Sequence, residues 1–252
     1  MDNEKNTDER SPWTRPGFVA AAAFLVVLVL LAGIVVVITG GDESDSAGAP
    51  APSGSAGGTA PGPGGGKGAN NKDACPTLKD TAQDVPQSTP KGLDWSLVQT
   101  VALPTSKASG PAVVEGSIAR CFAHTPTGAL IASAQIGGRY VWSSGWKQVT
   151  QDQTVGDGKS LYIKERTKVE ASQGPLTPQA DRHGQLAGFT FITYTPQTAV
   201  IQLVHRFANG GLVVTPVTMR WERGDWRLVL PANHAAQTRV NDLSGFVAFG
   251  GV

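Results

Sequence analysis

A cysteine and a histidine three positions apart are the side chains of this sequence whose types and spacing could do chemistry. They are Cys121 and His124, in the stretch "RCFAHTPTGALIASAQI". A thiol beside an imidazole can serve as a nucleophile with its general base. No acidic residue follows nearby to orient the imidazole, so the pair lacks the third group that such a centre uses.

The two cysteines of the chain, Cys75 and Cys121, allow a second interpretation of the same thiol. Both cysteines follow the apolar segment at residues 17–39, which is expected to direct the rest of the chain out of the cytoplasm. In an oxidising compartment two such thiols pair. We therefore expect a Cys75–Cys121 disulfide, which would close a loop of roughly fifty residues and constrain the unfolded chain by about 4 kcal/mol in the loop-entropy model. The nucleophile remains the alternative.

The other candidates for chemistry are scattered side chains without partners at a recognisable spacing. His205 falls at an inward position between Leu203 and Phe207 on an apolar strand face, and Asp157 is a candidate carboxylate. Acid–base catalysis needs a tuned and oriented pair, so we expect no catalytic residue. The histidines form no metal-ligand cluster and no glycine-rich phosphate loop opens a helix, so we expect no metal and no cofactor. The side chains that could line a pocket are Tyr140, Tyr194, His205 and Trp221.

The residues after Cys121 predict the start of a helix. Thr125 can accept a hydrogen bond from a free amide of the first turn, and Pro126 suits the first helical position. His124 is then a polar residue at the helix entrance. Gly128 and the small residues after it make the helix slender enough to press closely onto a sheet. We interpret His124, Thr125, Pro126 and Gly128 as a structural motif.

In the exported part of the chain we expect helices first and strands after them. Residues 159–172 predict a charged amphipathic helix, whose Glu165, Arg166 and neighbouring lysines belong to a solvated face. Segments rich in β-branched and aromatic residues, separated by short turns, predict antiparallel strands at Gly188–Thr195, Thr198–Phe207, Gly211–Trp221 and Asp225–Leu230. Pro216 indicates a bulge or an edge in the third strand. The fold class is therefore α+β, with helices packed on a curved antiparallel sheet.

An uncharged apolar run, residues 17–39, has the length of a membrane-spanning helix. A cleaved signal peptide is the competing interpretation, but its apolar region is typically only about 7 to 15 residues long. The cations that precede it are Lys5, Arg10 and Arg15. Because the next Lys or Arg after the run is Lys67, the positive-inside rule places residues 1–16 in the cytoplasm as a short tail. The chain is therefore expected to be a single-pass protein of the cell membrane.

Residues 40–71 are rich in Gly, Pro, Ser and Ala, and they predict a flexible linker. Residues 72–252 are long enough for one domain, which the linker would hold on the extracellular side. The net charge of the chain is +1. Direct binding of nucleic acid is not expected, because there is no surplus of cations to attract a phosphate backbone.

The stretches "FAHTPTGAL" and "GDWRLVLPANH" resemble the exported domain of a family of uncharacterised actinobacterial single-pass membrane proteins, often associated with mobile conjugative elements. The order of elements is similar to the cone-shaped nuclear transport factor 2-like fold. The layout of anchor, linker and domain resembles the bitopic scaffold subunits of type IV secretion and conjugation machines. These resemblances carry no catalytic residue over to this chain.

The resemblance implies a non-enzymatic scaffold that docks onto envelope or transfer-complex proteins, with a homo-oligomer as an expected arrangement. One alternative is a module that binds a small apolar molecule or lipid in the pocket of the cone, and another is a hydrolase or isomerase. A scaffold predicts a shallow or residue-filled cone and a sticky outer sheet face. A binding module predicts a deep, dry pocket. An enzyme needs His205 or Asp157 facing that pocket with a charged partner.

Overall fold

The computed structural model of the chain describes residues 75–177, 183–233 and 236–250. The predicted cytoplasmic tail, membrane helix and linker lie outside the described residues. Within the described ranges, no helix is long and apolar enough to cross a membrane. Helices pack against a mostly antiparallel sheet, which confirms the α+β class.

Two short hairpins precede the helices, so the expectation that helices come first is wrong. Their strands are β1 (Leu93–Val98), β2 (Val101–Ser106), β3 (Val113–Glu115) and β4 (Ile118–Arg120). β1 pairs with β2 and β3 with β4, and both pairs are antiparallel. Their sequence signal is weak because Pro104 interrupts β2, and because strands of three residues such as β3 and β4 are too short for a period to show.

Helices and a larger sheet follow the hairpins. The described helices are α2 (Pro126–Trp142), α3 (Trp146–Gln153) and α4 (Gly158–Gln173). The strands are β5 (Thr154–Val155), β6 (Gln185–Tyr194), β7 (Thr198–Arg206), β8 (Leu212–Glu222), β9 (Asp225–Val229), β10 (Thr238–Val240) and β11 (Val247–Ala248). Their order is β11-β6-β7-β8-β9-β5, with β10 beside β8, and only the short β5–β9 pair is parallel among the described strands. The four predicted strands are confirmed as β6 to β9, and the charged helix as α4.

Pro216 lies where β8 has a neighbouring strand on one side only. It pairs with Gln202 of β7. On the other side, the pairing with β10 reaches Val214 and the pairing with β9 begins at Met219. A proline has no amide hydrogen to donate to a neighbouring strand. The strand itself lies inside the sheet, between β7 and β9, and this local gap in the pairing accommodates the proline in place of the predicted bulge or edge.

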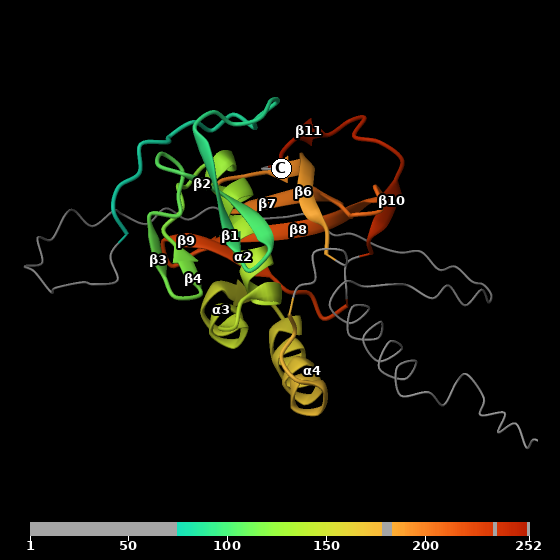
Figure 1. Ribbon diagram of the computed structural model, residues 1–252. Helices are drawn as coiled ribbons and strands as arrows, with labels where there is room; N and C mark the ends of the chain where they lie inside the picture. The colour runs from blue at the N-terminus through green and yellow to red at the C-terminus, as the bar shows by residue number, and fades with distance from the viewer. Residues whose placement is uncertain (1–74, 178–182, 234–235, 251–252) are drawn as a thin grey trace, which may run out of the picture. The chain divides into compact units, whose positions relative to one another are not determined.

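Helix α2 lies between the β1–β2 hairpin and the larger sheet, and most of its residues are buried (Figure 1). Oγ1 of Thr125 accepts the amide hydrogen of Gly128 at 3.0 Å, and Pro126 occupies the first turn, which confirms the predicted cap. A Cβ added to Gly128 would lie 2.0 Å from the carbonyl oxygen of Ala123. Only glycine permits this close approach between the helix and the segment before it.

The segment that joins β4 to α2, residues 121–125, is held by the carboxylate of Asp225. Oδ2 of Asp225 accepts the amide hydrogen of Cys121 at 2.8 Å, and Oδ1 accepts that of Phe122 at 3.0 Å. The amide of Trp226 also donates to Oδ1, at 3.0 Å. Asp225 is 4% exposed. Burial raises the pKa of this carboxyl, while the three amide donors and a nearby arginine act in the opposite direction.

The predicted disulfide between Cys75 and Cys121 is confirmed. Because its sulfur is bonded, Cys121 is not available as a nucleophile in this structure. A second carboxylate, that of Asp80, ties the segment after Cys75 to the start of α2. Its Oδ2 accepts the hydroxyl hydrogens of Ser109 at 2.8 Å and Thr125 at 2.7 Å. The beginning of the domain is thus fixed to the helix cap by a covalent bond and by side-chain hydrogen bonds.

Replacing Asp225 by Asn should lower the free energy of unfolding by about 3 kcal/mol, because an amide group would point its own N–H at backbone donors. Urea unfolding followed by tryptophan fluorescence measures the change. Asp242→Asn is the matched control, since exposed Asp242 also accepts a backbone amide, that of Ser244 at 2.8 Å. The control should have a much smaller effect. Equal losses in the two variants would contradict the role assigned to Asp225.

Candidate functional site

A cavity of about 530 Å³ lies between the carboxyl-terminal half of α2, helix α4 and the sheet face formed by β7, β8 and β9. Most of the side chains around it are aliphatic, among them Leu103, Ala134, Leu203, Val217, Leu228 and Leu230. Small-molecule sites in proteins have volumes of about 300 to 1,000 Å³ and are mainly apolar. The described residues therefore form a candidate site for a small apolar ligand.

Two adjacent glycines of α2 explain part of this space. A Cβ on Gly138 would lie 2.6 Å from Cδ2 of Leu103, so this glycine lets β2 approach the helix. Gly137 borders the cavity, and a Cβ added there would meet no atom within 4 Å. The lack of a side chain at Gly137 therefore leaves volume that a larger residue could fill.

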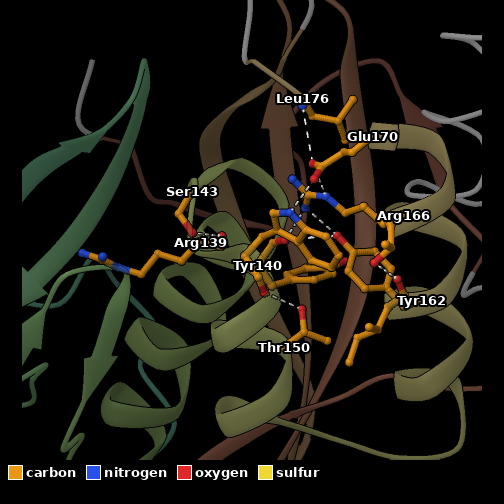
Figure 2. Close-up of polar contacts among 11 residues, drawn as sticks. Arg139, Tyr140, Ser143, Thr150, Tyr162, Arg166, Glu170 and Leu176 are labelled. Carbon is orange, nitrogen blue, oxygen red and sulfur yellow. Dashed lines mark hydrogen bonds and ion pairs between the residues drawn. The ribbon is translucent and has the colours of Figure 1, made fainter. Parts of the chain in front are cut away.

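Helix α4 borders the other side of the cavity and is anchored by a buried arginine. Arg166 donates from Nε to Oε1 of Glu170 at 3.0 Å and from Nη1 to the carbonyl oxygen of Tyr140 at 2.6 Å (Figure 2). Its guanidinium lies 4.2 Å from the ring centre of Trp146, whose Nε1 donates to Oε2 of Glu170 at 2.8 Å. The Arg166 side chain is 1% exposed. The interpretation of this residue as part of a solvated face is therefore wrong.

Two tyrosines complete what we call the anchoring cluster, which consists of Tyr140, Trp146, Tyr162, Arg166 and Glu170. The Tyr162 hydroxyl donates to the carbonyl oxygen of Tyr140 at 3.1 Å and accepts from Nη1 of Arg166 at 2.9 Å, as Figure 2 shows. Burial raises the pKa of Tyr140 to about 12 and also raises the pKa of Tyr162, with Arg166 partly offsetting both effects. Both phenols are therefore neutral near pH 7, and they contribute aromatic walls and hydrogen bonds.

His205 faces the cavity, whereas Asp157 does not border it. His205 lies on β7 and is half-buried, and burial lowers the pKa of its imidazole to about 4, so the ring is neutral at pH 7. Asp157 is exposed just before α4. Among the described residues, neither side chain has a charged partner within hydrogen-bond reach. The oriented acid–base pair that an enzyme needs is not found at these two positions.

Of the predicted pocket residues, Tyr140 and His205 border the cavity. Tyr194 and Trp221 lie on the same sheet face but at the opposite end of the strands. Both pack around the buried Trp226, with ring centres 6.3 Å and 5.4 Å away. The alternation of the strands places all these residues on one face, but it does not indicate which end of that face stays open.

His124 is packed at that opposite end, away from the cavity. Its ring stacks on Trp221 with the ring centres 3.9 Å apart, and its Nε2 is hydrogen-bonded to the carbonyl oxygen of Pro196. The backbone carbonyl of His124 accepts from Nε2 of Gln83 at 3.0 Å. These are the contacts of a residue at a helix entrance. In the part of the chain that the structure describes, no group of three or more His, Cys, Asp or Glu side chains could hold a metal ion.

The anchoring cluster was not predicted, although the sequence carries a signal for part of it. Tyr162, Arg166 and Glu170 follow one another at intervals of four residues, which places them on one face of a helix. A polar helix face of this kind is usually solvated. Nothing within α4 reveals that Trp146 and the carbonyl of Tyr140, from two other helices, cover this face.

A family model described as Domain of unknown function (DUF8175) matches residues 45–248. The match covers most of the chain and every element from β1 to β11. No curated protein and no solved structure matches the chain. The function must therefore be argued from the cavity and the residues around it.

Replacing Arg166 by Gln should loosen α4, because Glu170, which is 19% exposed, would lose its cation and the carbonyl of Tyr140 would lose a donor. A loss of about 2 kcal/mol in local opening free energy would accelerate amide hydrogen exchange across α4 by roughly thirtyfold. Hydrogen–deuterium exchange followed by mass spectrometry measures the exchange rates of the α4 peptides. Lys164→Gln, which removes an exposed cation of the same helix, should leave the rates unchanged. Wild-type rates in Arg166→Gln would contradict the anchoring role.

Proposed function

We propose that this chain, which belongs to the family described as Domain of unknown function (DUF8175), binds a small apolar molecule between α2, α4 and the sheet. The observation that carries the proposal is the cavity of about 530 Å³ with mainly aliphatic walls. Moving an apolar molecule from water into such a space is favourable by about 25 cal/mol for each Å² of apolar surface buried. The anchoring cluster supports the proposal because it holds α4 over the space instead of letting the helix collapse into it.

Ligand binding has more support than the other functions that the sequence suggests. A scaffold predicts a shallow or residue-filled cone and a sticky outer sheet face, whereas the space here has a volume of about 530 Å³. Among the described residues outside α4, the large exposed apolar side chains are Leu97, Val114 and Ile192, which come from three separate strands. An enzyme predicts a charged partner beside His205 or Asp157, and neither residue has one among the described side chains. A binding module predicts a deep, dry pocket, and the mainly aliphatic walls of a cavity of about 530 Å³ support that function over the others.

The proposed setting is the extracellular face of a cell membrane. Residues 17–39 would anchor the chain with its amino terminus in the cytoplasm, and residues 40–71 would tether the domain. The Cys75–Cys121 disulfide supports an oxidising location. The cavity between the helices and the larger sheet supports the resemblance to the nuclear transport factor 2-like fold, although two hairpins precede the helices. Contacts with envelope or transfer-complex proteins, or with a second copy, would use the outer surface and leave the cavity for the ligand.

Photoactivatable alkyl chains test the proposal on the full chain in its membrane. Two chains of equal length are used, one ending in a hydroxyl and the other in a carboxylate. Irradiation should cross-link at least one of them to peptides that border the cavity, from α2 and α4, and mass spectrometry locates the cross-links. If neither chain labels these peptides above the level of the rest of the domain, the proposal is wrong.

A matched pair of variants at Gly137 separates binding in the cavity from adsorption on the surface. Gly137→Phe places a ring in the space that this glycine leaves open and should reduce the labelling by about tenfold or more. Gly137→Ala adds only a methyl group, so the labelling should persist while the free energy of unfolding rises by about 0.5 to 1 kcal/mol. Equal labelling of the two variants would place the bound chain elsewhere.

A further inference from the structure

The charges around the cavity restrict the chemistry of its ligand, an inference that rests on the binding function proposed above. Arg166 and Glu165 are the charged side chains that border the cavity among the described residues. The charge of Arg166 is balanced by Glu170, with Nε and Oε1 3.0 Å apart. Glu165 makes no ion pair or hydrogen bond with any described residue. The described lining therefore carries an unbalanced carboxylate and no unbalanced arginine or lysine.

A polar corner, which we define as His205, Thr215 and Gln237, lies where β7 and β8 border the cavity. In the register of these strands His205 is opposite Val213 and Thr215 is opposite Leu203, so His205 and Thr215 occupy neighbouring positions on one face. Oγ1 of Thr215 accepts from Nε2 of Gln237 at 3.2 Å. The imidazole of His205 has no hydrogen-bond partner among the described residues.

His205 borders the cavity, and its neutral imidazole has one N–H donor and one nitrogen acceptor. Burial keeps the ring neutral, since it lowers the pKa to about 4. A half-buried polar group that lacks a partner gains when a ligand supplies one. A hydroxyl is the smallest uncharged group that can bond to either nitrogen, by donating to the acceptor or by accepting from the N–H.

We propose that the ligand is an aliphatic alcohol, with its apolar body among the aliphatic walls and its hydroxyl bonded to His205, and that the cavity rejects the corresponding carboxylate. A carboxylate head would be desolvated beside apolar walls, without an unbalanced cation among the described residues to pair with it. Glu165 would repel it. The hydroxyl of an alcohol meets neither of these penalties, and it gives one nitrogen of the imidazole a hydrogen-bond partner.

The two photoactivatable chains compare these head groups directly. At neutral pH the hydroxyl chain should label the cavity peptides about tenfold more than the carboxylate chain. Only the carboxylate chain would have to bury a charged head group without a cation to pair with it. Glu165→Lys should reduce this ratio by about fivefold, since it replaces the repelling charge by an attracting one. The two chains partition differently into the membrane, but that difference is the same for every variant. The change in the ratio therefore reports the cavity.

Variants of His205 test the hydrogen bond to the hydroxyl. His205→Leu removes the donor and the acceptor and should reduce labelling by the hydroxyl chain by about tenfold, whereas His205→Gln keeps both and should reduce it far less. If the carboxylate chain labels the cavity peptides as much as the hydroxyl chain or more, the proposal of an alcohol ligand is wrong. The proposed binding function would not be contradicted by that result. A ratio that is unchanged in Glu165→Lys would also overturn the proposal of an alcohol ligand. Labelling by neither chain would overturn both proposals.

Discussion

The carboxylate of Asp225 connects the start of β9 to the segment that leads into α2. This segment has no regular secondary structure, and Cys121 adopts a positive φ of 69°. Buried amide hydrogens in such a segment must find acceptors, and Asp225 provides them for Cys121 and Phe122. The indole Nε1 of Trp226, the next residue of β9, donates to the carbonyl oxygen of Ala123 at 2.9 Å. Helix α2 therefore begins where β9 holds it.

The position of α2 determines the space around it. Because Thr125 caps the helix and Gly128 packs against Ala123, the helix runs closely between the hairpin and the sheet. Before its last turn the helix has two adjacent glycines, and Gly137 leaves open space that borders the cavity. Helix α4 is fixed independently, by the anchoring cluster around Arg166. The cavity thus lies between two helices that separate polar networks hold apart.

The features that local sequence determines were predictable. The cap at Thr125 and Pro126 and the strands β6 to β9 depend on residue types and periods within a few positions, and the structure agrees with the predictions. The disulfide followed from an argument about compartment and from the small number of cysteines. The hairpins before α2 were not predicted, since a proline and very short strands conceal their pattern.

The determinants of the candidate site depend on residues far apart in the chain, and they were harder to predict. Asp225 was predicted only as the first residue of a strand, yet its carboxylate binds amides more than a hundred positions earlier. Arg166 looked solvated because its covering partners, Trp146 and Tyr140, come from other helices. His205 was identified because strand alternation shows which face a residue occupies. The same alternation could not separate Tyr194 and Trp221, at the filled end, from His205 at the open end.

Native mass spectrometry of the full chain, purified from the membranes of its own host, tests the central claim that the cavity is a binding site. Wild-type protein should carry the mass of one additional small molecule, and Gly137→Phe prepared in the same way should lack that mass. Lipids bound elsewhere on the protein would add the same mass to both proteins, so the difference between the two spectra reports only the cavity. Identical spectra for the two proteins, with or without bound molecules, would contradict the account.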